Sequence, residues 1–222
     1  MLQPSITLLG LVIQEPMTTL TDLVVAAVCF YAFAKLSHLK SPESSFTYFR
    51  YFFLFMGIST TLGGIIGHGL LHYLSFAWKT PGWVAGMFSV ALMERGAIMH
   101  ARHLMKPIVG KIFDYLNIIE LCIFMFIAFY TLNFAYVEIH ATYGLLLSLG
   151  LEIFIFVKRR DEGSKLIMYG VLVSSGAAIT HVAKISIHPW FNHFDLAHMF
   201  MAASCYVFYL GVRKMTFLPF VK

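Results

Sequence analysis

The sequence predicts an all-α integral membrane protein, a bundle of seven transmembrane helices. Of its 222 residues, 59% are hydrophobic and only 12% are charged, whereas a typical soluble domain is about 45–50% apolar and about 25% charged. The mean hydropathy is +0.77. The apolar residues form long runs without the alternation of membrane β-strands, and about 20 apolar residues suffice for a helix to cross a bilayer. Helical spans are therefore expected.

Seven such runs follow one another along the chain. They occupy residues 17–36, 46–74, 81–103, 114–132, 134–157, 165–187 and 192–212. Because the connections between them are short, we expect residues 1–222 to form one domain, with residues 1–16 as a short segment on the outer side. No Lys or Arg precedes the apolar part of that segment, which does not fit an ordinary signal peptide.

The basic residues predict the orientation of the bundle. All Lys and Arg residues except Lys79, Arg95 and Lys184 lie in or beside the connections after the first, third and fifth helices, or near the C-terminus. The positive-inside rule then places the N-terminus outside and the C-terminus in the cytoplasm. The net charge of +5 is explained by these connections, so no nucleic-acid partner is expected. All three tryptophans lie at the opposite boundary, where aromatic residues gather: Trp78, Trp83 and Trp190.

Histidines gather near the outer ends of three predicted helices. His68 and His72 lie four residues apart at the end of the second helix, so both imidazoles would project from one face and could bind one metal ion. His181 lies near the outer end of the sixth helix, and His193 and His198 lie at the start of the seventh. This grouping predicts a metal site on the non-cytoplasmic side of the second, sixth and seventh helices.

Asp195 lies three residues before His198 and would share its helix face. It could ligate the ion, orient a ligand or take a proton. Imidazole with carboxylate suits zinc, and iron, copper or nickel are alternatives. The simpler interpretation is structural. Asn192 would cap the seventh helix with Asp195 in its first turn, and histidines at helix ends can extend towards lipid headgroups.

Further acidic residues lie deeper in the predicted spans, where ionisable groups usually face the bundle interior. Glu94 is expected to belong to the histidine site as a base or proton shuttle, and the alternative is a buried ion pair with Arg95 or another partner. Glu120 and Glu152 lie towards the inner half of the fourth and fifth helices. Asp22, in the outer third of the first helix, is another acid near the histidines, although it also suits a helix start.

Seven helices, a histidine in the second helix and two histidines at the seventh resemble the CREST membrane hydrolases, which include alkaline ceramidases and the progestin and adipoQ receptors. The resemblance implies a zinc ion held by three histidines and hydrolysis of a lipid amide. His68 or His72 would correspond to the histidine of the second helix, and His193 with His198 to the later pair. Glu94 would stand where the family has an aspartate in the third helix.

We therefore expect a zinc-dependent membrane hydrolase that acts on a lipid or another hydrophobic small molecule. Three of the four histidines at positions 68, 72, 193 and 198 would hold the ion and leave one position open for water. An alternative is a metal-ion or proton transporter or channel, in which Glu94, Glu120 and Glu152 would carry charge inward. A haem or quinone protein is a further alternative. Only a channel requires polar groups on facing helices through the full depth of the bundle.

Overall fold

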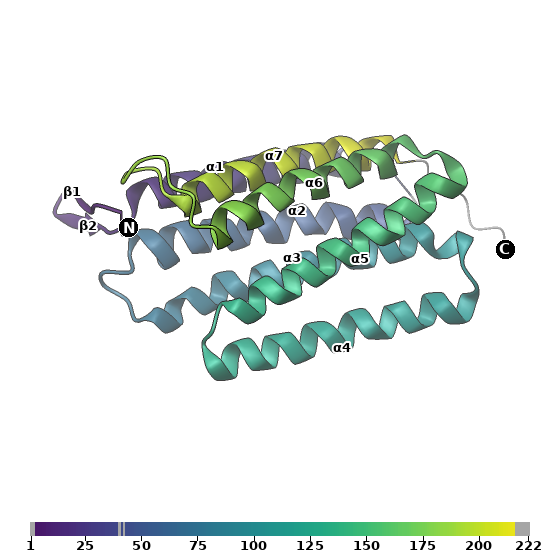
Figure 1. Cartoon of the computed structure of the whole chain (residues 1–222), viewed down its shortest axis with the longest axis horizontal. Helices are drawn as coiled ribbons and strands as arrows, with labels where there is room; N and C mark the ends of the chain where they lie inside the picture. Colours follow the sequence, from purple (N-terminus) through teal and green to yellow (C-terminus); the bar gives the residue numbers. More distant parts are fainter. Residues whose placement is uncertain (1–2, 40, 42, 216–222) are drawn as a thin grey trace.

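The computed structural model describes residues 3–39, 41 and 43–215 and shows a bundle of seven long α-helices (Figure 1). The helices are α1 (Pro16–Ser37), α2 (Ser44–Leu62), α3 (Thr80–Ala101), α4 (Pro107–Thr131), α5 (Ala135–Arg159), α6 (Glu162–Val182) and α7 (His193–Lys214). The prediction of a helical bundle is confirmed.

Six segments are long and apolar enough to cross a membrane: α1, α2 together with the π-helix that follows it, α4, α5, α6 and α7. They indicate a multi-pass membrane protein. The remaining helix, α3, is buried along much of its length and carries Glu94, Arg95 and small residues such as Gly86 and Ala97. Close packing inside the bundle suits such a composition better than contact with lipid does.

The helices pack in a ring with one helix outside it. α1 contacts α2, and the contacts continue through α3, α5, α6 and α7 back to α1. α4 packs mainly along α3 and α5, and it forms one edge of the molecule in Figure 1. Its outer face exposes large apolar side chains such as Ile119 and Phe126. The main core lies inside the ring, where Phe49, Phe53 and Ile167 are buried.

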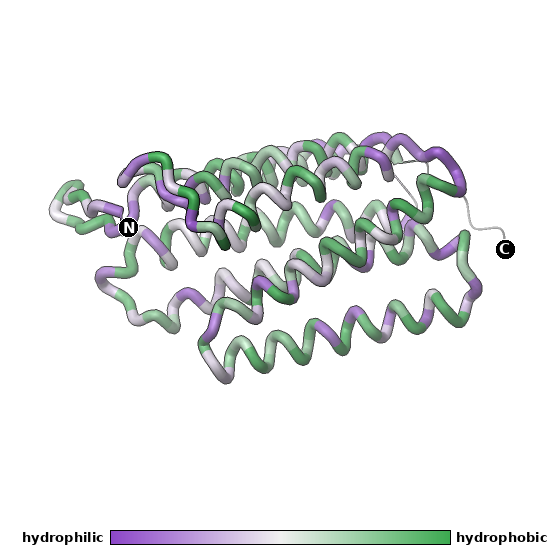
Figure 2. Tube along the Cα trace, viewed as in Figure 1, coloured by the Kyte–Doolittle hydropathy of each residue, from purple (hydrophilic) through white to green (hydrophobic). Residues whose placement is uncertain are grey.

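Hydrophobic residues cover the lengths of the helices, and hydrophilic residues gather at their ends, most densely at the connection between α5 and α6 (Figure 2). Lys158 and Arg159 lie in the last turn of α5, and Arg160 follows them in the connection. α1 begins and α7 ends at opposite ends of the bundle (Figure 1).

Ahead of α1, residues 1–16 were expected only as a short segment, and no strand was predicted there. The structure contains a small antiparallel hairpin of β1 (Ile6–Leu8) and β2 (Leu11–Ile13). Leu9 and Gly10 connect the strands with φ values of 51° and 80°. A two-residue turn with positive φ at both positions matches the twist of the strands.

The second predicted helix, at 46–74, changes from α to π after Leu62, and the prediction is wrong beyond Gly69. The chain continues as the π-helix η1 (Gly63–Gly69), turns through residues 70–74, and enters the short 3₁₀ helix η2 (Phe76–Lys79). Glycine permits this path, because a Cβ at Gly64 would lie 2.9 Å from the Cβ of Asp22. The π-helix can therefore approach α1 closely.

Two other helix ends differ from the prediction. The sixth helix was predicted to reach residue 187, but α6 ends at Val182, and Lys184 then adopts a positive φ of 50°. A left-handed residue stops a helix. α4 begins at Pro107 rather than 114, after the short 3₁₀ helix η3 (Arg102–Leu104), because proline is well suited to a first helical position.

Candidate functional site

Two groups of carboxylate and imidazole side chains lie inside the bundle. The His–Asp–His cluster consists of Asp22 on α1, His68 on η1 and His198 on α7. The Glu–Glu–His cluster consists of Glu94 on α3, Glu120 on α4 and His140 on α5. They lie on different sides of the ring of helices, because one is built on α1 and α7 and the other on α3, α4 and α5.

Asp22 is the centre of the His–Asp–His cluster. Its Oδ1 lies 3.4 Å from Nε2 of His198, and its Oδ2 lies 4.0 Å from Nε2 of His68. The two imidazole centroids are 6.4 Å apart. The π-helix makes this possible, since Thr19 donates a hydrogen bond to the carbonyl of Gly64 and so ties η1 to α1. π-helical segments are rare and are frequently found at functional sites.

Each histidine of this cluster is also held through its other ring nitrogen. Nδ1 of His68 contacts Oε2 of Glu15, and Nδ1 of His198 lies 3.0 Å from Oγ1 of Thr21. Burial acts to raise the pKa of Glu15, but its hydrogen bond to His68 and the charges of His68 and Lys79 outweigh burial and lower it. Glu15 is therefore ionised at neutral pH. Burial also lowers the pKa of Lys79, against the opposing effects of Glu15 and Asp22.

Asp195 was predicted as a ligand or base, but in the structure it contacts Thr21, which in turn contacts His198. Its Oδ2 accepts hydrogen bonds from the backbone N–H of Asn192 at 2.6 Å and from Nε2 of Gln3 at 3.1 Å. Its Oδ1 accepts one from Thr21 at 3.4 Å. The predicted cap is confirmed, because Asn192 and Asp195 form a capping box at the start of α7. Through Thr21, Asp195 also positions His198.

The other three predicted histidines lie outside the His–Asp–His cluster. His72 lies in the exposed turn after η1, so the expected common helix face with His68 is not formed. Nε2 of His181 lies 2.8 Å from Oε1 of Glu138. The rings of His181 and His193 are 5.5 Å apart. In the described part of the chain, no three of the five predicted histidines bring ligand atoms within 4.8 Å of one another, and neither do Asp22, His68 and His198.

The Glu–Glu–His cluster brings three such ligand atoms within 4.8 Å of one another. Nδ1 of His140 lies 2.7 and 2.9 Å from the two carboxylate oxygens of Glu120, and its Nε2 donates to the backbone carbonyl of Met87 at 3.0 Å. Oε2 of Glu94 accepts a hydrogen bond from Nδ2 of Asn117 at 3.2 Å. Glu94 and His140 are fully buried.

Glu94 therefore does not join the histidines at positions 68 and 198, as was predicted. It also does not pair with Arg95, which was the alternative. Arg95 donates hydrogen bonds to Asp114 at 2.6 Å and to Oδ1 of Asn117 at 3.0 Å. Asp114 contacts Arg102 as well, so Asn117 is the side chain that connects this ion-pair group to Glu94.

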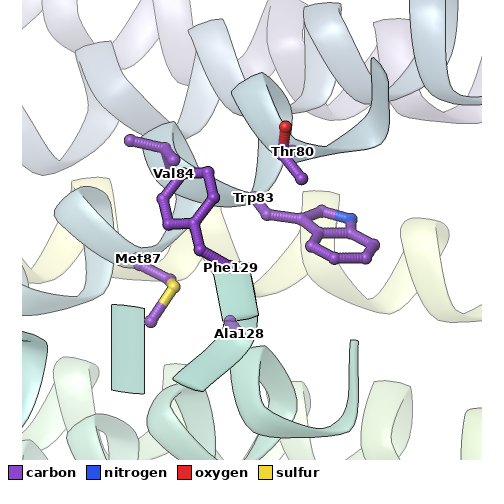
Figure 3. Close-up of a pocket in the computed structure, with 6 residues that line it drawn as sticks. All are labelled: Thr80, Trp83, Val84, Met87, Ala128 and Phe129. Atoms are coloured by element: carbon purple, nitrogen blue, oxygen red, sulfur yellow. The ribbon is translucent and has the colours of Figure 1, made fainter. Parts of the chain in front are cut away.

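A small apolar cavity lies between α3 and α4 beside the Glu–Glu–His cluster (Figure 3). Its lining residues are Thr80, Trp83, Val84, Met87, Ala128 and Phe129. Met87, whose carbonyl accepts from His140, belongs to this wall, and no lining residue is charged. The cavity thus gives the cluster an apolar cover rather than a ligand.

The family of the chain follows from a match over most of its length. Residues 17–216 match the model of a family described as a family of unknown function, DUF6962. The chain belongs to this family. Both clusters lie inside the matched residues, whereas Glu15 and Gln3, which support the first cluster, precede them. No curated protein and no solved structure matches the chain.

Buried polar residues also form a line on the face of α5 that packs against α3, which the sequence analysis missed. His140, Ser148 and Glu152 are all fully buried and lie eight and four residues apart. Oε2 of Glu152 lies 3.3 Å from Nδ1 of His100 on α3. The four-residue spacing of Ser148 and Glu152 marks one helix face and was the signal in the sequence that could have revealed part of this line.

Proposed function

We propose that this family member is a membrane hydrolase that holds a zinc ion between His68, Asp22 and His198 and acts on a lipid or another hydrophobic, amide-type substrate. One observation carries the proposal. Both histidines are held through Nδ1 and direct Nε2 at the same carboxylate, Asp22. The resemblance to the CREST hydrolases implies one histidine from the second helix and two from the seventh, and the proposal keeps His68 and His198 of these.

The hydrogen-bond chemistry of the cluster suits a metal ion. If Nδ1 of His198 donates to Thr21 and Nδ1 of His68 donates to Glu15, each Nε2 carries only a lone pair. The carboxylate of Asp22 also offers only lone pairs, so these groups attract a proton or a cation between them. Histidines that bind metals commonly donate their other N–H to an oxygen acceptor, which is the role that Glu15 and Thr21 fit.

Nitrogen and carboxylate oxygen ligands are those that zinc prefers, with iron, copper or nickel as alternatives. When bound, zinc would lower the pKa of a coordinated water to about 7 and supply a nucleophile for hydrolysis. His68 and Glu15 have side chains that are 15% and 14% exposed, which leaves the cluster open towards one end of the bundle. The ring of Phe194 lies 5.8 Å from that of His68 and offers an apolar wall for a hydrophobic substrate.

Zinc content and hydrolysis by the purified full chain test this proposal. We expect the wild type to bind zinc and to release fatty acid from a fluorescent ceramide, and we expect Asp22→Asn and His198→Ala to lose one equivalent of zinc together with the hydrolysis. The matched control is His72→Ala, because His72 lies at the same end of the bundle in the exposed turn. Equal zinc in the wild type and the Asp22→Asn variant contradicts the metal site. Normal zinc without hydrolysis contradicts the substrate assignment.

The proposed topology has seven spans, including α3, with the N-terminus outside and the His–Asp–His cluster on the non-cytoplasmic side. The basic connection between α5 and α6 supports it. The exposed apolar residues of α4 would contact lipid tails. A cysteine introduced at Lys158 in a variant without native cysteines should react with a membrane-impermeant thiol reagent only after the cells are permeabilised. Labelling in intact cells reverses the topology.

Transport of protons or metal ions is a second candidate, because the polar line on α5 faces α3. From His140 to Glu152 it covers about 18 Å, at about 1.5 Å per helical residue, and the Oγ of Ser148 between them has no hydrogen-bond partner among the described residues. Proton flux into proteoliposomes tests it. A flux that falls in Glu152→Gln favours transport, and vesicles that stay as tight as protein-free ones exclude proton conduction.

A further inference from the structure

We propose that Glu94, Glu120 and His140 form a second, separate metal site that binds a divalent transition-metal ion between α3, α4 and α5. The site is independent of the proposed hydrolase, because it shares no residue with the His–Asp–His cluster and lies on a different side of the ring of helices. Its ligand set is one imidazole and two carboxylates. Such a mixed set suits Mn²⁺, Fe²⁺ or Zn²⁺.

The tautomer of His140 supports a metal ligand at Nδ1. The carbonyl of Met87 can only accept, so Nε2 of His140 carries a proton and donates it to that carbonyl at 3.0 Å. Nδ1 then faces both oxygens of Glu120, which are 2.7 and 2.9 Å away. Donation from the distal ring nitrogen to a backbone carbonyl is the usual way in which proteins fix the orientation of a metal-bound histidine.

Glu94 contributes an oxygen that nothing else in the described structure uses. Its Oε2 is fixed by Nδ2 of Asn117, while its Oε1 is buried and accepts no hydrogen bond. A carboxylate oxygen without a partner in an apolar interior costs free energy, and a cation would remove that cost. Asn117 is itself fixed, because its Oδ1 accepts from Arg95 and its Nδ2 also donates to the carbonyl of Ala91.

The backbone of α5 leaves space for this carboxylate. A Cβ at Gly144 would lie 2.6 Å from Oε1 of Glu94, a contact too short for any other residue type without a shift. Gly144 lies one helical turn after His140, so the same face of α5 supplies both the imidazole ligand and the space for Glu94.

The charges of the site also fit a divalent cation. Glu94 and Glu120 would carry two negative charges beside a neutral imidazole. The nearby cations Arg95 and Arg102 both bind Asp114, so they are committed to a different carboxylate. A single proton shared by His140 and Glu120 would neutralise only one of the two acids. Protonation of both acids is the rival state, and the experiment below separates it from metal binding.

Manganese binding by the purified full chain is the test. We would load Mn²⁺ into the Asp22→Asn variant, which lacks the other proposed metal site, remove free ion by gel filtration, and measure metal content and the electron paramagnetic resonance spectrum. We expect about one equivalent of Mn²⁺ in Asp22→Asn and a loss of at least tenfold in affinity when Glu94→Gln or Glu120→Gln is added. The matched control is Glu43→Gln, which removes another buried carboxylate, 4.0 Å from His103.

Unchanged binding in the Glu94→Gln and Glu120→Gln variants would overturn this site, and so would a folded Asp22→Asn protein without bound Mn²⁺. If the glutamine variants do not fold, the melting temperature of Asp22→Asn protein decides, because it should rise with Mn²⁺ and not with Mg²⁺. The two proposals fail separately. The zinc site fails if Asp22→Asn binds as much zinc as the wild type, whereas this site fails if the glutamine substitutions leave metal binding unchanged.

Discussion

The two clusters contain similar chemical groups but are built in different ways. The His–Asp–His cluster depends on irregular backbone, because His68 comes from a π-helix and Glu15 from the segment before α1. The Glu–Glu–His cluster comes from three regular helices, and Glu94 and His140 are fully buried. A partly open cluster suits exchange of substrate and water, whereas an enclosed one suits a resident ion that supports the packing of α3, α4 and α5.

Asp195→Ala should have the largest effect on stability and should act only at the first cluster. It removes Asp195's half of the capping box of α7 and leaves one N–H of the Gln3 amide and the backbone N–H of Asn192 without their acceptor, while Gln3 still donates to the carbonyl of Trp190. Loss of a cap costs about 0.5–2 kcal/mol, and each unsatisfied buried donor about 1–3 kcal/mol. We expect the free energy of unfolding in detergent to fall by about 3 kcal/mol.

The conservative variant Asp195→Asn retains one acceptor oxygen and should lose less stability. A decrease of less than about 1 kcal/mol for Asp195→Ala would show that Asp195 does not support the start of α7. Metal binding at the Glu–Glu–His cluster should be unchanged in both variants.

Gly144→Ala should disrupt the second cluster alone. The added Cβ would lie 2.3 Å from Cγ1 of Val90 and 2.6 Å from Oε1 of Glu94, and overpacking of this kind costs about 1–3 kcal/mol. The control is Gly150→Ala on the same helix, where a Cβ meets nothing within 4 Å. Unfolding measurements should show a loss for the first variant and no loss, or a gain of up to about 1 kcal/mol, for the second. Equal stabilities would contradict the packing of Glu94 against α5.

Thr21→Val should lower metal affinity at the first cluster alone, because it removes the contact that orients His198 but removes no proposed ligand. The hydroxyl of Thr21 lies 3.0 Å from Nδ1 of His198, and loss of such a supporting contact typically lowers metal affinity about 10–100-fold. Thr61→Val is the control, because the Thr61 hydroxyl donates only to the carbonyl of Gly57 on its own helix. If zinc titrations give Thr21→Val and Thr61→Val the same affinity, Thr21 does not orient His198 and only contributes to packing.

Glu15 should give the smallest effect, which is present at neutral pH and lost in acid. Its pKa is lowered in the folded protein, so its ionised form stabilises the fold at neutral pH. That contribution should disappear as the pH falls below the usual glutamate pKa, about 4.3, and through the folded-state value. Glu15→Gln should be less stable than the wild type at pH 7 and similar to it at the lowest pH. A constant difference across the whole range would contradict the interaction with His68.

The sequence predicted the helices well and the sites only in part. Long apolar runs and the cap at Asn192 are local features, so the bundle and the start of α7 were predicted correctly. The π-helix was missed, because its path depends on how closely the glycines of η1 approach α1. That error placed His72 beside His68.

Long-range pairs were also missed. Asp22 was noted as an acid near the histidines, but its place between His68 and His198 depends on the packing of α1 against α7 and η1. The pairing of Glu120 with His140 joins two helices whose relative rotation no spacing in the sequence determines.

X-ray absorption at the zinc edge of the zinc-loaded Glu120→Gln variant tests the central claim most directly, because this variant should keep only the His–Asp–His site. We expect one tightly bound zinc ion per chain with two imidazole ligands, the remaining ligands being oxygen, and we expect His72→Ala to leave that spectrum unchanged. A spectrum with three or more imidazoles, or one that changes in His72→Ala, would contradict this site and support the histidine-only site that the sequence predicted. Absence of bound zinc would contradict a metal site at His68, Asp22 and His198.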